Sequence, residues 1–401
     1  MKSILYLHQY FVTPDEYGAT RSYWFAKKLI ENGYKVTVIS LISSTTKRLP
    51  GKYNIDGIDV IYLPTQYSNL QSNLFKIYNF IKFFILALHQ SLKLRDIDLV
   101  YATSTPITVG GISYIYNKIT KVEYIFEVRD LWPDFPIQMG VIKNKFLIKI
   151  LKKIETKIYE NAVHIVALSP GMKNGVMSVG IPDKKVTVIS NMSKPDIFYP
   201  RDANNDVLTE YNIDPKNLNV IHFGSMGIAN GLDYIIDAAI LASNNRIDNV
   251  QFYFAGYGTT ENKLKLLVNL YKLANVHFLG KFNTFKMSEI VNCMDVSVVC
   301  FKNHEVLKTN SPNKLFDSLS AGKLIIVNSA GWTKDLVEEY KCGYYVNPND
   351  PGDLLSKLLN ISENKIQLSM LSHNARKISI EVFDKELLSE EFKNLIISII
   401  K

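Results

Sequence analysis

The sequence predicts an α/β protein built from two doubly wound, Rossmann-like domains that face each other across a cleft. Short apolar runs typical of strands alternate with helical stretches, pause in a polar, proline-containing segment at 191–203, and then begin again. Such alternation builds parallel sheets covered by helices. A chain of 401 residues is long enough for two domains of this kind. Because ligands of open parallel sheets bind beyond the carboxyl ends of the strands, we expect the site in the cleft.

The first half begins with a strand at 3–8, a turn-rich loop, a helix near 18–32 and a strand at 35–40. This spacing is typical of a βαβ unit. Further strands are expected at 59–63, 98–103, 123–128, 164–169 and 186–190. We therefore place the first domain at 1–195.

The second half repeats the pattern after the linker. Strands are expected at 219–224, 250–256, 276–280, 296–300, 324–328 and 344–347. A last helical segment, near 384–400, has no strand after it. These runs place the second domain at 200–379.

Composition limits the classes of function. Three scattered cysteines do not make a disulfide framework or a zinc site, so we expect reduced thiols and a cytoplasmic protein. Residues 1–200 carry 25 Lys and Arg against 15 Asp and Glu, a net charge of +10, whereas residues 201–401 carry 21 against 23, a net charge of −2. This skew suggests an anionic partner for the first half, either a membrane surface or a phosphorylated substrate. Nucleic acid is disfavoured because the basic residues are not interleaved with a recognition motif.

Two helical segments of the first half are unusual. The segment 74–92 is apolar and aromatic around Phe83 and Phe84, but its uncharged run is too short to span a bilayer. It is either a buried helix or a helix that dips into a membrane. The segment 143–160 flanks an apolar stripe with lysines that include Lys149, Lys152 and Lys153. It is either a solvated helix packed on the sheet or a basic helix against anionic headgroups.

Glycines stand at the junctions between strands and helices in both halves. Gly18 opens the first helix, where a backbone N–H can approach an anion, and Arg21 can add a phosphate contact. An ordinary turn glycine and a solvated arginine are the alternatives. The second half has a loop with three glycines, among them Gly224, and a further pair that ends the next strand. Tight turns explain these glycines equally well, but their position favours a phosphate loop. The candidate residues there are Gly224, Ser225, Asn230, Gly256 and Gly258.

The segment 307–323 is the most informative. A loop leads directly into a helix, with Ser311 or Asn310 suited to cap it and Pro312 suited to its first turn. Lys314 and Asp317 are three residues apart and share a helical face. A lysine and unpaired N–H groups at a helix start, including that of Asn313, suit a diphosphate. A carboxylate one turn later suits the hydroxyls of a ribose. A surface ion pair between Lys314 and Asp317 is the alternative.

Asp130 follows the strand at 123–128, so we expect its carboxylate at the ligand end of the sheet. There it can contact sugar hydroxyls or orient an acceptor, and a structural cap is the alternative. Arg129 lies beside it, and the sequence leaves open which of the two residues points inward. No His, Asp and Glu cluster has the spacing of a metal site. We therefore expect no metal and no cofactor, with lysine and helix dipoles stabilising a leaving phosphate.

The chain resembles glycosyltransferase family four, the retaining enzymes of GT-B fold, and most closely a WbuB-like branch that builds bacterial O-antigen and capsule repeats. The residues that carry the resemblance are HQYFVTPDEYGATRS, RDLWPD, ISNMSKPDIF, FGSMGIANGLD and SPNKLFDSLSAGK. The resemblance implies that the first domain binds the acceptor and the second the nucleotide-sugar. It also implies that a final helix, 380–401, packs back on the first domain.

The chain departs from the family pattern at the donor site. The family's two glutamates eight positions apart read here as Thr309 and Asp317, so one carboxylate is missing and the other is shortened. The family's arginine and lysine in the glycine loop read as Ser225 and Asn230. Lys314 is the natural substitute for the missing cations.

These features predict a glycosyltransferase of the hexosyltransferase class that transfers an N-acetylated sugar from a UDP-sugar. This nucleotide-sugar is a substrate rather than a cofactor. The expected acceptor is a glycan on a lipid diphosphate, and the expected location is the inner face of the cell membrane, where the protein is peripheral. A nucleotide-sugar epimerase of the same fold and a non-catalytic binding subunit are the alternatives.

Overall fold

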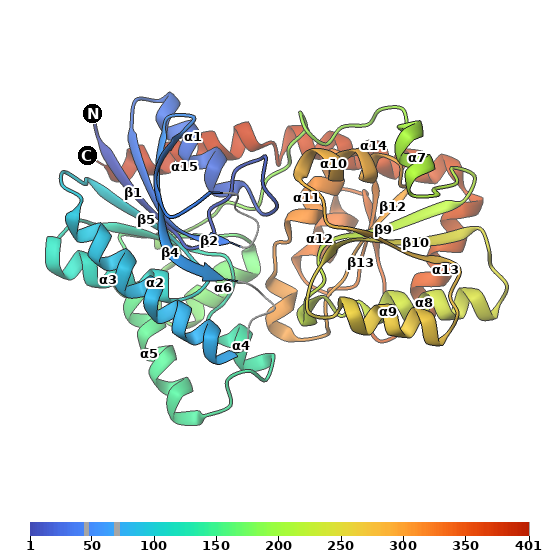
Figure 1. Cartoon of the computed structure of the whole chain (residues 1–401), viewed down its shortest axis with the longest axis horizontal. Helices are drawn as coiled ribbons and strands as arrows, with labels where there is room; N and C mark the ends of the chain where they lie inside the picture. The colour runs from blue at the N-terminus through green and yellow to red at the C-terminus, as the bar shows by residue number, and fades with distance from the viewer. Residues whose placement is uncertain (44–47, 68–72, 401) are drawn as a thin grey trace. The chain divides into compact units, whose positions relative to one another are not determined.

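The computed structural model describes residues 1–43, 48–67 and 73–400, and the chain divides into two compact units (Figure 1). Unit 1 consists of Met1–Ser190, Thr309–Ser311 and Glu386–Lys401. Unit 2 consists of Asn191–Lys308 and Pro312–Lys385. Each unit contains a largely parallel sheet covered by helices, which is the doubly wound architecture that the sequence predicts.

The described part of unit 1 holds an eight-stranded sheet in the order β3-β4-β2-β1-β5-β6-β7-β8. Its strands are β1 (Ser3–His8), β2 (Lys35–Ser43), β3 (Gly51–Ile55), β4 (Ile58–Tyr67), β5 (Leu99–Thr103), β6 (Tyr124–Val128), β7 (His164–Ala167) and β8 (Val186–Val188). All neighbours are parallel except β3, which runs antiparallel to β4. The strand order reverses between β1 and β5.

Strand β3 was not expected from the sequence. It forms a hairpin with β4 through Asp56 and Gly57, both of which have positive φ, 51° and 87°. Asp-Gly is a favoured pair for a two-residue hairpin turn that needs positive φ at both positions. The Asp-Gly turn therefore indicated a hairpin in the sequence. The strand itself was not recognised, because it is short, polar and at the edge of the sheet.

Helices cover both faces of the unit 1 sheet. They are α1 (Arg21–Glu31), α2 (Asn73–Lys93), α3 (Thr108–Thr120), α4 (Asp134–Gln138), α5 (Lys145–Asn161), α6 (Pro170–Ser178) and α15 (Lys385–Ile399). Helices α2, α3 and α5 lie side by side on one face (Figure 1). On the other face, Phe392 of α15 stacks on Phe25 of α1 at 4.1 Å and meets Tyr101 of β5 edge-on. The C-terminal helix is thus part of the core of unit 1.

The described part of unit 2 holds a six-stranded parallel sheet in the order β11-β10-β9-β12-β13-β14. Its strands are β9 (Leu218–Ser225), β10 (Val250–Tyr257), β11 (Val276–Gly280), β12 (Val296–Val299), β13 (Leu324–Val327) and β14 (Gly343–Tyr345). Its helices are α7 (Asn205–Glu210), α8 (Asp233–Asn244), α9 (Glu261–Leu270), α10 (Thr284–Asn292), α11 (Asn313–Ser320), α12 (Trp332–Glu339), α13 (Pro351–Glu363) and α14 (Lys365–Glu381). This is the strand order of a dinucleotide-binding fold, with its switch point between β9 and β12.

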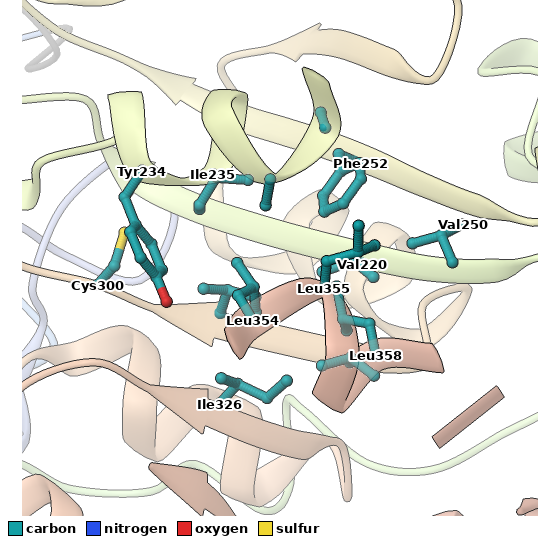
Figure 2. Close-up of a cluster of buried hydrophobic side chains, with 14 of the residues drawn as sticks. Val220, Tyr234, Ile235, Val250, Phe252, Cys300, Ile326, Leu354, Leu355 and Leu358 are labelled. Carbon is teal, nitrogen blue, oxygen red and sulfur yellow. The ribbon is translucent and has the colours of Figure 1, made fainter. Parts of the chain in front are cut away.

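The core of unit 2 lies between the sheet and helices α8 and α13 (Figure 2). Val220 of β9 and Phe252 of β10 point from the sheet toward Ile235 of α8 and Leu354 of α13. These side chains are almost completely buried. Strands with apolar residues on both faces are what a sheet covered on both sides requires. The core fixes the strand ends that carry the candidate site.

Candidate functional site

The glycine loop of unit 2 follows β9 at the switch point of the sheet. Gly224 has φ +100° and Gly231 has φ +58°, conformations that side chains rarely adopt. Between them, Asn230 Nδ2 donates a hydrogen bond of 2.9 Å to the Ser225 carbonyl. This bond closes the loop and holds Asn230 at the carboxyl end of β9. Gly224, Ser225 and Asn230, all expected at this site, are therefore brought together.

The second glycine pair has a packing explanation. A Cβ on Gly256 would lie 1.8 Å from the Gly224 carbonyl oxygen, and one on Gly258 would lie 2.4 Å from that of Met226. Both glycines let the end of β10 approach the loop after β9 backbone to backbone. Close backbone packing therefore accounts for both glycines, and the donor contact expected of Gly256 and Gly258 stays a prediction.

Lys314 reaches from the first turn of α11 to the end of β9. Its Nζ lies 2.9 Å from His222 Nε2 and 3.3 Å from Asn230 Oδ1. A Cβ on Gly224 would lie 3.5 Å from Lys314 Cε, an ordinary contact distance, so Lys314 passes directly beside this glycine. Lys314 is buried, and burial lowers the pKa of its ammonium to about 8.

The charge of Lys314 is not balanced. Among the residues that the structure describes, no carboxylate forms an ion pair with it, and its hydrogen-bond partners are a neutral ring nitrogen and an amide. A buried charge without a partner is costly. An anion at the carboxyl end of β9 would compensate it, and this is the position where open sheets of this order bind phosphates.

The start of α11 differs in detail from the expectation. The residue before the helix is Pro312, with an extended φ of −78° and ψ of 133°, and it makes no side-chain cap bond. The cap position that was expected for Ser311 or Asn310 is therefore occupied by Pro312. Asn313 is the first helical residue, so its backbone N–H lies in the first turn beside Lys314.

Asp317 does not pair with Lys314. Its carboxylate forms an ion pair of 2.8 Å with Lys194, whose ammonium also lies 5.5 Å from the centre of the Phe198 ring. Burial raises the pKa of Asp317, and Lys194 opposes this shift. A surface pair between Lys314 and Asp317 is thus excluded. The proposed contact of Asp317 with a ribose stays a prediction. The carboxylate would make this contact while it is paired with the buried Lys194 ammonium.

Arg21 is the clearest correction in unit 1. It is 1% exposed, and its Nε donates to Glu127 Oε1 at 2.7 Å. Its terminal nitrogens donate to the backbone carbonyls of Ile189 and Ser190. Every polar face of the guanidinium is engaged within the protein, so Arg21 does not offer a phosphate contact. Gly18 is exposed in the loop before it, with φ +148°, and its anion contact stays a prediction.

A second polar group gathers at the carboxyl ends of β1, β5 and β6. Thr105 Oγ1 donates to Asp130 Oδ2 at 3.1 Å, and Arg129 Nη1 lies 3.3 Å from His8 Nε2. Burial raises the pKa of Asp130 to about 6, against the opposing effects of Thr105 and Arg129. Burial and the charge of Arg129 lower the pKa of His8 well below its ordinary value. Asp130 therefore lies at the ligand end of the unit 1 sheet.

Two family models match consecutive parts of the chain. The model described as Glycosyltransferase Family 4 matches residues 19–195, and the model described as Glycosyl transferases group 1 matches residues 206–378. The chain is a family 4-like glycosyltransferase of the GT-B fold. The fold and enzyme class expected from the sequence are confirmed.

Solved structures show the same architecture as the glycosyltransferase. Sucrose-phosphate synthase from Thermosynechococcus elongatus matches with a TM-score of 0.79 at 15% identity, over 100% of this chain and 99% of that one. Anabaena HepE in complex with UDP and glucose matches with a TM-score of 0.70 at 16% identity, over 99% of each chain. WaaG, a glycosyltransferase involved in lipopolysaccharide biosynthesis, matches with a TM-score of 0.69 at 13% identity, over 98% of this chain and 99% of that one. At these identities the likeness concerns the fold.

The curated relative that matches is an uncharacterized glycosyltransferase of Methanocaldococcus jannaschii. It is 20% identical over 254 residues, and the match spans 63% of this chain and 63% of the relative. This relative identifies no donor, acceptor or partner. Those of the glycosyltransferase are therefore proposed below from its own residues.

The membrane candidates of the glycosyltransferase divide between core and surface. Phe83 is completely buried in α2, which corrects its assignment as an inserting residue, whereas Phe84 is half-buried and its assignment stays a prediction. The exposed stripe of α2 consists instead of Phe75, Tyr78, Ile81, Ile85 and Leu92. No helix in the described ranges is long and apolar enough to cross a membrane.

The buried residues of helix α5 are Glu155, Ile158 and Tyr159, all in its C-terminal half. Its N-terminal half exposes apolar side chains, with Phe146 74% exposed and Leu147, Ile150 and Ile154 exposed as well. Lys149 and Lys153 are exposed on the same half, whereas Lys152 forms an ion pair with Asp134 at 2.7 Å. The helix therefore packs on unit 1 through part of its length, and both alternatives, a solvated helix and a basic helix against headgroups, stay open predictions.

Four residues outside the predicted set define these sites: His222, Lys194, Glu127 and His8. His222 lies two residues before Gly224 in β9, so its side chain points to the same face of the sheet as that position. That spacing was the available signal. The partners of Lys194 and Glu127 are more than a hundred residues away, and no local pattern indicates them.

Proposed function

We propose that this glycosyltransferase transfers a sugar from a UDP-linked donor to a glycan precursor on a lipid diphosphate, with retention of configuration, in the synthesis of a bacterial surface polysaccharide. The observation that carries the donor half of this proposal is Lys314. It is a buried ammonium without a carboxylate partner among the described residues, at the switch point of a dinucleotide-type sheet. A nucleoside diphosphate supplies the missing negative charge. Anabaena HepE, which shares the fold, was solved with UDP.

In the proposed sugar transfer, the roles of the residues depend on where negative charge develops. When the bond between the sugar and the diphosphate breaks, negative charge builds up on the leaving phosphate. The Lys314 ammonium and the N–H groups of the first turn of α11 are positioned in advance to stabilise it. In unit 1, the Asp130 carboxylate is the group proposed to accept a hydrogen bond from an acceptor hydroxyl.

Two other functions fit the same fold. An epimerase would convert a UDP-sugar alone, with no second substrate and no release of UDP. A non-catalytic subunit would bind UDP without cleaving any donor, and Thr309 in place of a family carboxylate favours this alternative. Both predict that no UDP is released from a UDP-sugar.

The deciding experiment is a screen of UDP- and GDP-sugars for slow donor hydrolysis without acceptor, read as nucleotide release. We expect at least one UDP-sugar to release UDP, and the Lys314→Met variant to release it more slowly. Release of sugar isomers without UDP would favour the epimerase. UDP binding with no turnover of any donor, even with lipid-linked acceptors present, would favour the binding subunit.

We further propose that unit 1 attaches to an anionic membrane surface through the N-terminal half of α5. This half combines exposed apolar residues with exposed lysines, and an apolar stripe of α2 is exposed on the same face of the sheet. Interfacial helices carry this combination of an apolar face and basic flanks. Each basic residue near an anionic leaflet contributes on the order of 1 kcal/mol. A lipid-linked acceptor would meet the enzyme at such a surface.

Flotation with liposomes of anionic and of neutral lipids tests this attachment. We expect wild type to float with anionic liposomes, and less so at high salt, because salt screens the lysines. A variant with Phe146 and Ile150 changed to Asp should stay at the bottom. Leu266 and Leu270 of α9, which are exposed in unit 2, provide the matched control, and their change to Asp should not affect flotation. Equal behaviour of both variants would contradict attachment through α5.

A further inference from the structure

We infer that His222 is a positioning residue for the donor diphosphate: it accepts a hydrogen bond from the Lys314 ammonium and aims it at the carboxyl end of β9. This inference rests on the proposed donor site and adds to it a residue whose role is to orient the cation.

The hydrogen bonds of His222 fix its tautomer. Its Nδ1 lies 3.0 Å from the carbonyl oxygen of Val298 in β12, which can only accept, so Nδ1 carries the proton. The lone pair of Nε2 then points at Lys314 Nζ, 2.9 Å away. The ring therefore bridges the two strands of the switch point, β9 and β12, and presents an acceptor to the lysine.

The positive charge of Lys314 requires that His222 beside it be neutral. A protonated His222 would have no lone pair for Lys314 and would place two cations side by side in the core. Burial, and then the charge of Lys314, lower the pKa of His222 well below its ordinary value. A neutral imidazole, like the amide oxygen of Asn230, accepts a hydrogen bond from the ammonium without cancelling its charge. A carboxylate at 222 would cancel the charge and remove the attraction for a phosphate.

The geometry leaves one direction for the ligand. An ammonium has three donor hydrogens. One is directed to His222 Nε2 and a second to Asn230 Oδ1, whose own amide nitrogen is held by the Ser225 carbonyl. The third has no partner among the residues that the structure describes. Because the amine is tied at two points, this hydrogen is oriented before the ligand arrives, which reduces the entropy lost on binding.

Two substitutions separate the two bonds of the ring. His222→Asn places an amide nitrogen near the position of Nδ1, so it keeps the bond to Val298 and removes the acceptor for Lys314. His222→Gln places an oxygen near the position of Nε2, so it keeps the acceptor and removes the bond to Val298. A positioning role and a purely structural role therefore predict opposite orders of UDP affinity.

The experiment is calorimetric titration of UDP into wild type, both variants and His277→Leu. His277 is the matched control, because it is a half-buried histidine of the same sheet that contacts Gln251 and not Lys314. We expect His222→Asn to weaken UDP about tenfold, and His222→Gln and the control to stay within about threefold of wild type. Thermal unfolding of each variant verifies that it is folded at the temperature of the titration.

The pH dependence gives a second readout that a structural role would not change. A hydrogen bond to the charged form of Lys314 raises its pKa, so the loss of that bond in His222→Asn lowers it further. The pH at which UDP affinity begins to fall should therefore shift to lower values in His222→Asn but not in His222→Gln.

Equal affinity and equal pH dependence in wild type and His222→Asn would overturn the inference while leaving the donor site intact. The reverse order, with Gln weaker than Asn, would show that the ring acts only through Val298 and would also overturn it. If wild type itself does not bind UDP, the proposed donor is wrong, and the role of His222 fails with it.

Discussion

Unit 1 and unit 2 each bury a cationic side chain near the carboxyl ends of their strands, and the two cations have opposite surroundings. Arg21 in unit 1 is paired with Glu127, which also accepts from Thr103, and its other nitrogens donate to two backbone carbonyls. Lys314 in unit 2 has an imidazole and an amide as partners, and no carboxylate within the described ranges pairs with it. From the sequence, both residues were expected to bind phosphate.

The difference separates a structural cation from a binding cation. Burial raises the pKa of Glu127, but Arg21 and Arg129 outweigh this effect, so the pKa is lowered and the pair stays ionised. The pair is complete without a ligand. Burial lowers the pKa of Lys314 instead, because little in the folded protein favours its charged form. A site that the protein leaves incomplete is where an anionic substrate gains binding energy.

The largest expected effect is on the stability of unit 1. Arg21→Met leaves the buried Glu127 without its cation, and removing one partner of a buried pair costs about 3–5 kcal/mol. We expect urea unfolding to show a loss of this size. The double variant Arg21→Met, Glu127→Leu should recover much of it, because no unpaired charge remains. If the single variant is as stable as wild type, Arg21 is not the structural cation of this comparison.

Lys314→Met should have the opposite profile. We expect UDP to bind about ten- to a hundredfold more weakly, because a charge-assisted contact of about 1.5–3 kcal/mol is lost. The free energy of unfolding should be unchanged or higher, since an unpaired buried charge is removed. Calorimetry with UDP and urea unfolding measure the two effects on the same sample.

The stability of Lys314→Met relative to wild type should also depend on pH. Burial lowers the pKa of the folded ammonium to about 8 from an ordinary 10.5, so protonation of Lys314 destabilises the fold. This penalty is fully present below pH 8 and disappears as the pH rises toward 10.5. Any stability advantage of the variant should therefore shrink over that range. If the stability difference between Lys314→Met and wild type stayed constant over this pH range, Lys314 would not carry an unbalanced charge in the folded protein.

Asp317 should show a smaller effect. If its carboxylate contacts the ribose, Asp317→Asn should weaken UDP about three- to tenfold, as the loss of a hydrogen bond to a charged group does when the shape is kept. Lys194→Met is the control, because it breaks the same ion pair and leaves the carboxylate in place. Equal UDP affinity in wild type and Asp317→Asn would remove the ribose role and leave the pair with Lys194 as its function.

The fold was more predictable than the site. Apolar-rich runs located the strands of unit 2, since a sheet covered on both faces needs mainly apolar segments such as 219–224 and 296–300. The polar edge strand β3 escaped because it buries little, and periodicity reports only burial. Its Asp56-Gly57 turn was the one local signal that could have revealed it.

The site residues were predictable as a set but not in their roles. Gly224, Asn230 and Lys314 could be placed near one another, because strand ends and helix starts meet at the same edge of a parallel sheet. Whether a cation is balanced depends on residues far away in the sequence, as Glu127 is from Arg21. Local sequence patterns carry no information on such pairs, and for this reason Arg21 and Lys314 looked alike.

The last prediction assigns one limb of the pH profile of activity to each unit. Burial raises the pKa of Asp130 in unit 1 to about 6, and burial lowers the pKa of Lys314 in unit 2 to about 8. If the reaction needs the Asp130 carboxylate and the Lys314 ammonium, kcat/KM falls below about pH 6 as Asp130 gains a proton. It also falls above about pH 8 as Lys314 loses one. Asp130→Asn should flatten the acid limb alone, and Lys314→Met the alkaline limb alone, each with lower activity throughout. The control for the alkaline limb is Lys323→Met.

Burial also lowers the pKa of Lys323 to about 8, but its ammonium donates to the Asn292 carbonyl, away from the glycine loop. An alkaline limb that persists in Lys314→Met and disappears in Lys323→Met would contradict the assignment of the binding cation to Lys314.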